Sequence, residues 1–314
     1  MPKHRAAHVT IVALLLRCVV LLVCMVPAWA GEAPIAVIYP DVGEPYREIF
    51  EKIIEGIKSK ANPVTLHAVR NDSNIESLNS TLHRQNTGVV IALGRQGRQS
   101  ASALDRSFSL VIGGVLSAPE SETRPQRVIS LAPDPALLFM RLKMLMPNAK
   151  RVFVVYDPKN NAWLIKLAIE AAHAQGLELV AYQAQDLHTA VKFYQEIYSA
   201  ADSRKDALWL PQDTSTVEES SVLPLVLKKS WNQNITVFSS NTAHVRRGVL
   251  FSLYPNNVAL GKNLASLAKN FSASGEGGML PLRDVQIAVN LRTAKHLGLN
   301  TSRQQNFDMT FPEQ

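Results

Sequence analysis

Cysteine is almost absent from this sequence, and both copies, Cys18 and Cys24, lie within the first 30 residues. That opening segment has the form of a secretory signal, with basic residues at 3–5, an apolar stretch at 11–26 and small residues in Ala28-Trp29-Ala30. We expect export to the periplasm and cleavage after Ala30. The remaining chain would then have no disulfide, no cysteine metal ligand and no cysteine nucleophile. An uncleaved membrane anchor is the alternative for residues 1–30.

Strong charge and long apolar runs are also lacking. Loss of residues 1–30 lowers the formal charge from +7 to +4, because three basic residues and no acids leave. A net charge this small predicts no nucleic-acid partner. Beyond residue 30 no stretch of 18 unbroken apolar residues occurs, which excludes a polytopic membrane protein. The ordinary counts of glycine (15) and proline (17) exclude collagen-like and low-complexity chains.

Familiar catalytic and cofactor motifs are missing as well. The sequence has no P-loop, no G-x-G-x-x-G after a strand, no H-E-x-x-H and no G-x-S-x-G. The histidines beyond residue 30 never pair at positions i and i+4. We therefore expect no enzyme, no catalytic residue, no metal site and no cofactor, although a site built from distant residues escapes linear motifs.

What is present is a regular alternation of short apolar strands and amphipathic helices. The predicted strands lie at residues 35–39, 64–69, 88–93, 109–113, 127–131, 151–156, 177–182, 207–210, 235–238, 249–253 and 286–290. Such alternation predicts parallel sheets with helices on both faces. The units are too many for one ordinary sheet, and the pattern restarts after residues 133–147. We predict an α/β protein with two doubly wound, three-layer α/β/α lobes and a ligand cleft between them.

Several runs of residues follow one another in a specific order in the second half. They are Leu145–Val152, Val155–Pro158, Gly176–Val180, Asp206–Pro211, Val249–Tyr254, Leu260-Gly261-Lys262 and Val289-Asn290-Leu291-Arg292-Thr293-Ala294-Lys295-His296-Leu297-Gly298-Leu299. In these runs the chain resembles the ABC transporter substrate-binding protein family of type I periplasmic-binding fold, in the group that includes tryptophan/tyrosine-type uptake systems. Residues 31–125 match less well, since residues 123–130 stand where the family usually has a glycine-rich segment.

The resemblance implies a monomeric receptor that closes on a small solute and hands it to an inner-membrane ABC permease. It also implies three crossings of the chain between lobes. We expect an N-terminal lobe of residues 31–132 plus about 257–275, and a C-terminal lobe of residues 133–256 plus about 276–314.

Candidate ligand residues follow from the rule that ligands of open α/β sheets lie beyond the carboxyl ends of the strands. The candidates are Tyr39, Asp41, Arg95, Gln96 and Gly114 in the first lobe, and Asp157, Gln212, Asp213, Ser240, Asn241 and Tyr254 in the second. Asp213 would accept hydrogen bonds from a ligand ammonium group. Arg95, with the helix N-terminus after Gly94, would bind a carboxylate. Tyr254 would form an aromatic wall.

Simpler roles compete with these assignments. Asp41, Asp157 and Asp213 each stand where an acid caps a helix or stabilises a turn. A site with one acid, one base and aromatic walls suits a zwitterion, so the first expectation for the solute is an amino acid. Two other functions remain open, a periplasmic sensor of the same fold and a periplasmic hydrolase. A hydrolase would need a nucleophile and a base within hydrogen-bond reach across the cleft.

Overall fold

The computed structural model describes residues 34–117, 126–271, 277–299 and 307–312. The predicted signal segment, with its cleavage site after Ala30, lies outside the described residues, as do residues 123–125 of the segment that was compared with the family's glycine-rich stretch. No helix of the described part is long and apolar enough to cross a membrane.

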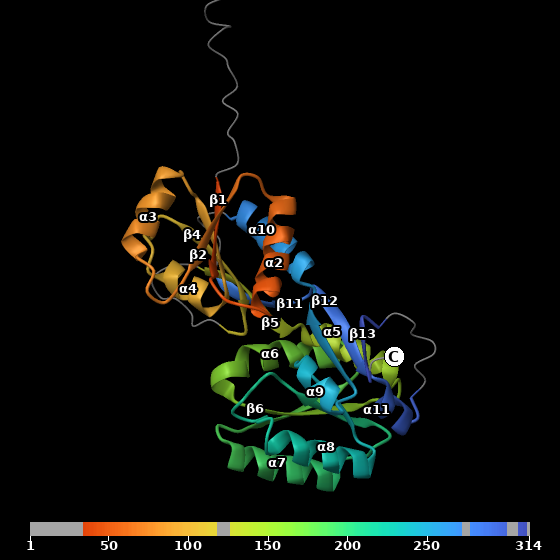
Figure 1. The fold of residues 1–314 in the computed structure, drawn as a ribbon. Helices are drawn as coiled ribbons and strands as arrows, with labels where there is room; N and C mark the ends of the chain where they lie inside the picture. Colours follow the sequence, from red (N-terminus) through yellow and green to blue (C-terminus); the bar gives the residue numbers. More distant parts are fainter. Residues whose placement is uncertain (1–33, 118–125, 272–276, 300–306, 313–314) are drawn as a thin grey trace, which may run out of the picture. The chain divides into compact units, whose positions relative to one another are not determined.

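Strands and helices alternate along the chain, as predicted (Figure 1). The strands are β1 (Ile35–Pro40), β2 (Val64–Val69), β3 (Val89–Leu93), β4 (Ser109–Val115), β5 (Gln126–Pro133), β6 (Arg151–Tyr156), β7 (Glu178–Gln183), β8 (Asp206–Leu210), β9 (Thr236–Ser239), β10 (Phe251–Pro255), β11 (Gly278–Leu282), β12 (Val285–Asn290) and β13 (Met309–Phe311). The helices are α2 (Tyr46–Lys60), α3 (Ile75–Arg84), α4 (Gly94–Ser102), α5 (Pro135–Leu145), α6 (Pro158–Ala174), α7 (Leu187–Ala200), α8 (Val222–Gln233), α9 (Thr242–Arg247), α10 (Asn257–Lys269) and α11 (Leu291–His296).

The strands form two sheets, each with helices on both faces. The first sheet has the order β11-β5-β4-β3-β1-β2 and is parallel throughout. The second has the order β13-β12-β10-β9-β8-β6-β7 and is parallel except for the pair of β10 and β12. We call each sheet with its helices the first and the second lobe. The predicted fold class, two doubly wound α/β lobes, is confirmed.

In the first lobe, α2 and α10 cover one face of the sheet and α3 and α4 the other. Ile53 and Ile57 of α2 and Leu264 of α10 share one apolar cluster with the strands. Helices α2 and α10 cross at Gly56 and Gly261. A Cβ on Gly261 would lie 2.0 Å from the carbonyl oxygen of Ile53, so this close approach requires glycine. That contact accounts for the glycine in the run Leu260-Gly261-Lys262.

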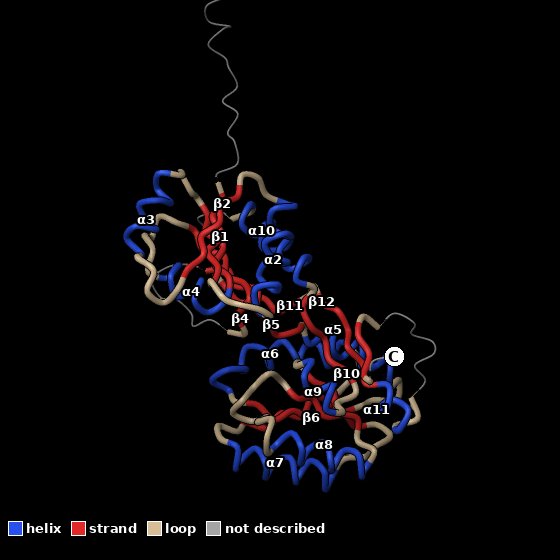
Figure 2. The backbone as a smooth tube through the Cα atoms, in the orientation of Figure 1, coloured by secondary structure: helices blue, strands red, loops and turns tan. Residues whose placement is uncertain are grey.

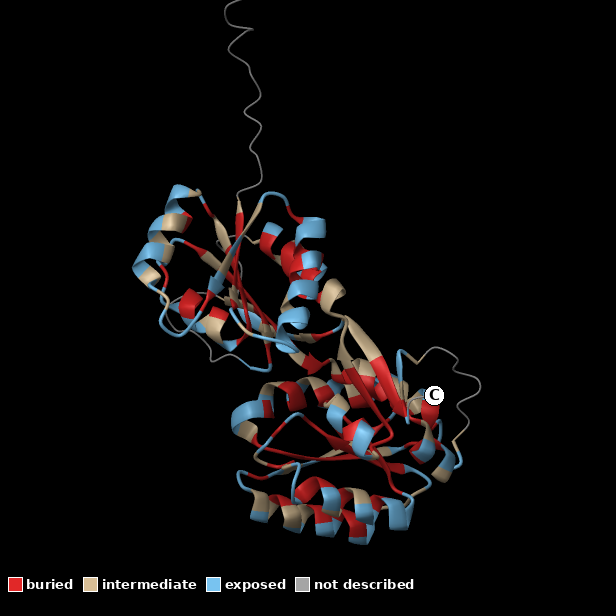
Figure 3. Ribbon diagram, viewed as in Figure 1, coloured by how far each residue is buried: buried red, intermediate tan, exposed pale blue. Residues whose placement is uncertain are grey.

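In the second lobe, α5 and α6 cover one face of the sheet and α7 and α8 the other, and the central strands β6, β8 and β9 between them are buried (Figure 3). The Phe139 ring meets the Trp209 indole edge-on, with ring centroids 5.8 Å apart and an interplanar angle of 89°. Such aromatic pairs add to the stabilisation from apolar burial. Trp209 is fully buried, so it belongs to the core of this lobe.

Two of the family-like runs meet in a buried ion pair of the second lobe. Arg151, at the start of β6, donates from Nε and Nη2 to the two carboxylate oxygens of Asp206 on β8, at 3.1 and 2.6 Å. Asp206 is fully buried, and its carboxylate also accepts the Asp202 N–H. The hydrogen bonds that Arg151 donates to the Asp206 carboxylate raise the pKa of Arg151. The pair fixes neighbouring strands in register.

The chain crosses between the lobes after β5, after β10 and after β11. Strand β11 pairs with β5 in the first sheet, so the lobe boundary expected near residue 275 falls between Leu282 and Val285 instead. Helix α8 begins at Val222. Before it, the carboxylate of Glu218 accepts the N–H groups of Ser220 and Ser221 and holds a turn.

Candidate solute-binding site

A cavity of about 800 Å³ is lined by residues of both lobes. Its lining residues come from the loops after β3 and β4 and from β5 in the first lobe, and from the loops after β6, β8 and β9 in the second. Figure 2 shows the course of the backbone at the neighbouring helices α4, α6 and α9. Its lining consists of Arg95, Arg98, Gly114, Val115, Leu116, Ser117, Leu131, Ala132, Asn160, Asn161, Gln212, Asp213, Thr214, Val217, Glu218, Glu219, Asn241 and His244. Pockets of this size commonly hold small molecules.

The first-lobe wall carries two guanidinium groups without partners. Arg95 and Arg98 stand one turn apart on α4 and so share a face of that helix. Neither has a hydrogen-bond or ion-pair partner within the described residues. The N-cap residue of α4, Leu93, supplies no side-chain hydrogen bond to the first N–H groups. This wall therefore presents positive charge and free donors to whatever enters the cavity.

Two glycines bring the backbone of that wall close together. Gly94 and Gly114 have φ values of 69° and 71°, in the left-handed region that glycine tolerates best. A Cβ on Gly114 would lie 3.2 Å from the backbone nitrogen of Gly94. The ends of β3 and β4 approach this closely only because both residues lack side chains.

The second-lobe wall is organised around the buried carboxylate of Asp213. Its Oδ2 accepts the backbone N–H of Asp157 at 2.8 Å and the side-chain amide of Asn161 at 3.0 Å. Its Oδ1 accepts the N–H of Ser215 at 3.0 Å. Asp157 in turn caps α6 by accepting the N–H of Lys159. Asp213 thus holds the loop after β8 against the loop after β6, and three protein N–H groups already bind its oxygens.

A serine and a histidine lie within hydrogen-bond distance beside this wall. Ser239 Oγ is 2.8 Å from His244 Nδ1, but Ser239 is fully buried and its hydroxyl donates to the Leu210 carbonyl. Burial lowers the pKa of His244 to about 4, against a weaker opposing effect of the Glu219 carboxylate. The hydroxyl has no access to the cavity, so this pair stabilises the turn after β9 and does not present a nucleophile.

The structure brings five of the sequence-predicted ligand residues to this cavity. They are Arg95, Gly114, Gln212, Asp213 and Asn241. Asn241 also caps α9 through its side-chain oxygen, which accepts the Ala243 N–H. Their contact with a solute stays a prediction.

Three other candidates of the first lobe have protein partners elsewhere. Tyr39 and Asp41 line a separate cavity of about 630 Å³ beside α2, and the Asp41 carboxylate accepts from Arg70 Nε at 2.7 Å. Gln96 donates to the side-chain oxygen of Asn71 at 2.8 Å. The sheet order explains Tyr39 and Asp41, because β3 separates β1 and β2 from β4 and β5.

Three candidates of the second lobe also lie off the cavity. Asp157 serves as the cap of α6, and Ser240 Oγ accepts the indole N–H of Trp209 at 3.0 Å. Tyr254 packs with the small apolar cluster of Val245, Ala288 and Phe311. The expected aromatic wall is therefore not found, and no Phe, Tyr or Trp side chain lines the cavity among the described residues.

Sequence reasoning missed several polar residues of the lining. They include Arg98, Asn160, Asn161, Glu218, Glu219 and His244. Arg98 was detectable in principle, because it follows Arg95 at i+3 in the segment that forms α4. Asn160 and Asn161 open the helix capped by Asp157, and only the packing of that helix shows that they face the cavity.

A family model described as ABC transporter substrate binding protein matches residues 139–306. The chain belongs to this family. Comparison with curated proteins gave no match. The run Asn290–Leu299 lies within the matched part of this substrate-binding protein, and there Asn290 caps α11 while its side-chain amide donates to the Val245 carbonyl at 2.8 Å.

Solved structures with the same fold are distant in sequence. The ligand-free, open structure of CD0873, a substrate-binding protein with adhesive properties from Clostridium difficile, is 17% identical, with a TM-score of 0.62 over 88% of this chain and 98% of that one. A conserved domain protein from Vibrio cholerae is 18% identical (TM-score 0.52; 89% and 99%). The ABC domain from Streptococcus pneumonia in complex with L-Trp is 16% identical (TM-score 0.51; 89% and 99%).

The fold and the family together assign the coarse function. The chain is a substrate-binding protein of the ABC transporter type, a class that binds small solutes and works with ABC permeases. At these identities the structural likeness establishes the fold only. The nature of the solute has to come from the residues that line the cavity.

Proposed function

We propose that this protein is a periplasmic receptor that captures a small solute bearing a carboxylate, first of all an amino acid, in the cavity between its lobes and delivers it to an inner-membrane ABC permease. The observation that carries the solute class is the pair Arg95 and Arg98 on α4, which line the cavity without partners in the described part of the chain.

A carboxylate fits this wall on simple electrostatic grounds. Guanidinium groups bind carboxylates through two parallel hydrogen bonds, and the geometry favours arginine over lysine. The uncapped N-terminus of α4 adds backbone N–H groups and a favourable dipole. Both effects act on the same end of a ligand.

The opposite wall supports a ligand that also carries donors. Glu218 and Glu219 are carboxylates, and Asn160, Gln212 and Asn241 offer amides that both donate and accept. The hydrogen bonds from Ser221 and Ser220 lower the pKa of Glu218 to about 2, so this group is an anion at neutral pH. An ammonium group therefore finds negative charge across the cavity from the arginines, which favours a zwitterion.

The chemical kind of the solute's side chain follows from which residues the lining lacks. Val115, Leu116, Leu131 and Val217 supply aliphatic contacts, and the described lining has no Phe, Tyr or Trp side chain on which an aromatic ligand could stack. The Streptococcus structure with L-Trp supports the idea that this fold accommodates an amino acid. The lining here favours a polar or aliphatic one.

The periplasmic location and the monomeric state belong to the same proposal. The family is typical of the periplasm, and residues 1–30 have the pattern of a cleaved export signal. Delivery to a permease requires that two lobes close around the solute, a motion that buries the ligand and changes the exposed surface.

A thermal-shift screen of the purified protein tests the solute class. The panel contains amino acids, their carboxamides, dicarboxylates, sugars and nucleosides. We expect at least one amino acid to stabilise the protein by about 2.7 kcal/mol at a hundred times its Kd, and its carboxamide to do so far less. Mass spectrometry of ligand that copurifies identifies the solute independently.

The double variant Arg95→Ala/Arg98→Ala sharpens the test. We expect a loss of affinity of roughly a hundredfold, since each charge-assisted contact contributes about tenfold. Arg106→Ala, an exposed arginine outside the cavity lining, is the matched control. Stabilisation by neutral sugars alone, or unchanged affinity in the double variant, would contradict the proposed solute class.

A further inference from the structure

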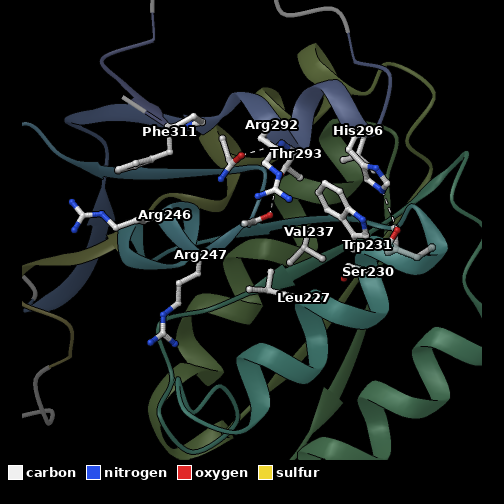
Figure 4. A pocket seen from close by; sticks show the side chains of 15 residues that line it. Leu227, Ser230, Trp231, Val237, Arg246, Arg247, Arg292, Thr293, His296 and Phe311 are labelled. Atoms are coloured by element: carbon white, nitrogen blue, oxygen red, sulfur yellow. Dashed lines mark hydrogen bonds between the residues drawn. The ribbon is translucent and has the colours of Figure 1, made fainter. Parts of the chain in front are cut away.

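A second cavity lies within the second lobe and shares no lining residue with the first (Figure 4). Its volume is about 440 Å³, within the range that small molecules fill. The walls come from α8, the end of α9, α11 and the region of β13. Because all of these elements belong to one lobe, the cavity does not depend on closure around a solute.

Apolar and aromatic side chains form the interior of this cavity. Leu227 and Val237 lie between Trp231 on one side and Phe311 on the other (Figure 4). The Trp231 indole is 39% exposed and stacks on the His296 ring, with centroids 3.6 Å apart and an interplanar angle of 7°. One large aromatic ring is thus held rigidly while part of it remains open to solvent.

The charges at the rim have one sign. Arg246, Arg247 and Arg292 line the cavity, and no carboxylate does so among the described residues. Arg247 is engaged, since it donates to the Glu219 carbonyl at 2.5 Å. Arg246 and Arg292 have no hydrogen-bond or ion-pair partner within the described residues, and their guanidinium carbons lie 5.4 Å from the ring centroids of Phe311 and Trp231 respectively.

The backbone around the cavity is held in place by buried polar contacts. Asn290 donates to the carbonyl of Val245, and Thr293 Oγ1 donates to the carbonyl of Gly248, both at 2.8 Å. Both side chains belong to the run of residues that resembles the family most specifically. These bonds join α11 to the end of α9. The elements that carry Arg246 and Arg292 therefore cannot move apart easily.

We propose that this cavity is a second binding site, for a small organic anion with a flat apolar body and a carboxylate. The apolar body contacts Trp231, Val237 and Phe311, and the carboxylate pairs with Arg292 and Arg246. Cations placed over aromatic rings are already held near the rim, which lowers the entropy lost when they bind an anion. The site is independent of the solute site and is occupied whether or not the cavity between the lobes holds a ligand.

The test uses naphthoate and its neutral isostere naphthamide as probes. Heteronuclear NMR follows the indole N–H resonances of the tryptophans, and a Trp231→Phe variant assigns the signal of Trp231. We expect naphthoate to shift the Trp231 signal in a saturable manner, and naphthamide to bind roughly tenfold more weakly, as loss of a charge-assisted contact predicts. Higher salt should weaken the acid and leave the amide unchanged.

The variant Arg246→Ala/Arg292→Ala should bind both probes equally weakly. Arg106→Ala/Lys166→Ala removes the same charge from exposed positions outside this cavity and should behave like the unchanged protein. The site is refuted by an unshifted Trp231 signal, by equal affinity for acid and amide, or by a double arginine variant that still prefers the acid. Arg95→Ala/Arg98→Ala should leave the naphthoate titration unchanged, which separates this site from the solute site.

Discussion

The two walls of the solute cavity differ in how their polar groups are used. In the second lobe, Asp213, Asn161 and His244 bond to other protein groups and are buried. In the first lobe, Arg95 and Arg98 have no such partners within the described residues. In the second-lobe wall, these polar groups already bond to other protein groups and serve as a framework. The first-lobe wall presents charge that a ligand can neutralise.

This difference runs parallel to the extent of the family match, and it is consistent with the proposal that the first lobe determines which solute binds. The family model covers residues 139–306, most of which lie in the second lobe. The polar residues there stabilise loops, a role that suits any solute. The arginines of α4 lie outside the matched range. Under the proposed function, a change there would alter ligand choice without disturbing the framework. The following substitutions distinguish residues of the framework from residues of ligand recognition. They are given in order of their expected effect on stability, the largest first.

Gly261→Ala should be the most destabilising of these changes. The new Cβ meets the backbone carbonyl of Ile53, so the helices α2 and α10 must separate, at a cost of about 3 kcal/mol. Urea unfolding measures the effect. Gly43→Ala, where an added Cβ meets nothing within 4 Å, is the matched control, and similar stabilities for the two variants would show that the helix crossing tolerates a side chain.

Asp213→Asn should destabilise the second lobe by about 2 kcal/mol, because an amide in this place turns one of its donors toward the N–H groups of Asp157 or Asn161. Chemical denaturation gives the value. Asp186→Asn serves as the control, since this exposed residue caps α7 and asparagine caps a helix about as well as aspartate. An unchanged midpoint for Asp213→Asn would mean that its carboxylate is free for a ligand after all.

The stability of the protein should fall between pH 7 and pH 5 because of His244. Its pKa is about 4 in the folded protein against a usual 6.5, so the unfolded state binds more protons in this range. The contribution is complete above pH 6.5 and declines toward pH 4, with about 2 kcal/mol lost at pH 5. His244→Gln should remove this difference in unfolding free energy, whereas the exposed His188→Gln should retain it.

Arg95→Ala/Arg98→Ala should leave the unfolding free energy within about 0.5 kcal/mol of the original value, because neither guanidinium contacts a protein partner in the described residues. Calorimetry without ligand checks this. A clearly lower stability would show that the arginines belong to the framework, and the contrast between the two walls would disappear.

Much of the fold could be predicted from the sequence, because buried parallel strands are short apolar runs and their helices carry apolar stripes. The segment Val89–Leu93 and the stripe of Ile53 and Ile57 show this plainly. Strand β13 was missed, since three residues at a sheet edge have no periodicity. The antiparallel pairing of β12 with β10 was not predicted for a different reason. It depends on the crossing of the chain between the lobes after β11, which no local sequence pattern marks.

The site was predictable only in part. The rule of strand ends selects every loop at that edge, and the selection included Arg95, Gly114, Gln212, Asp213 and Asn241, which line the cavity. It could not exclude Tyr39 or Asp41, because the distance of β1 from the cavity follows from the strand order. Nor could it show that Ser240 turns inward to Trp209.

The sequence by itself determined the α/β class, the two sets of strands and the loops from which a site could be made, because these follow from local hydrophobic periodicity and from the direction of parallel strands. Only the tertiary structure decided which polar groups remain available. Asp213 and Arg95 are both charged loop residues in the sequence, but Asp213 is surrounded by N–H donors and Arg95 is not. Hydrogen-bond satisfaction depends on neighbours distant in the chain, and so it is fixed only when the lobes have folded.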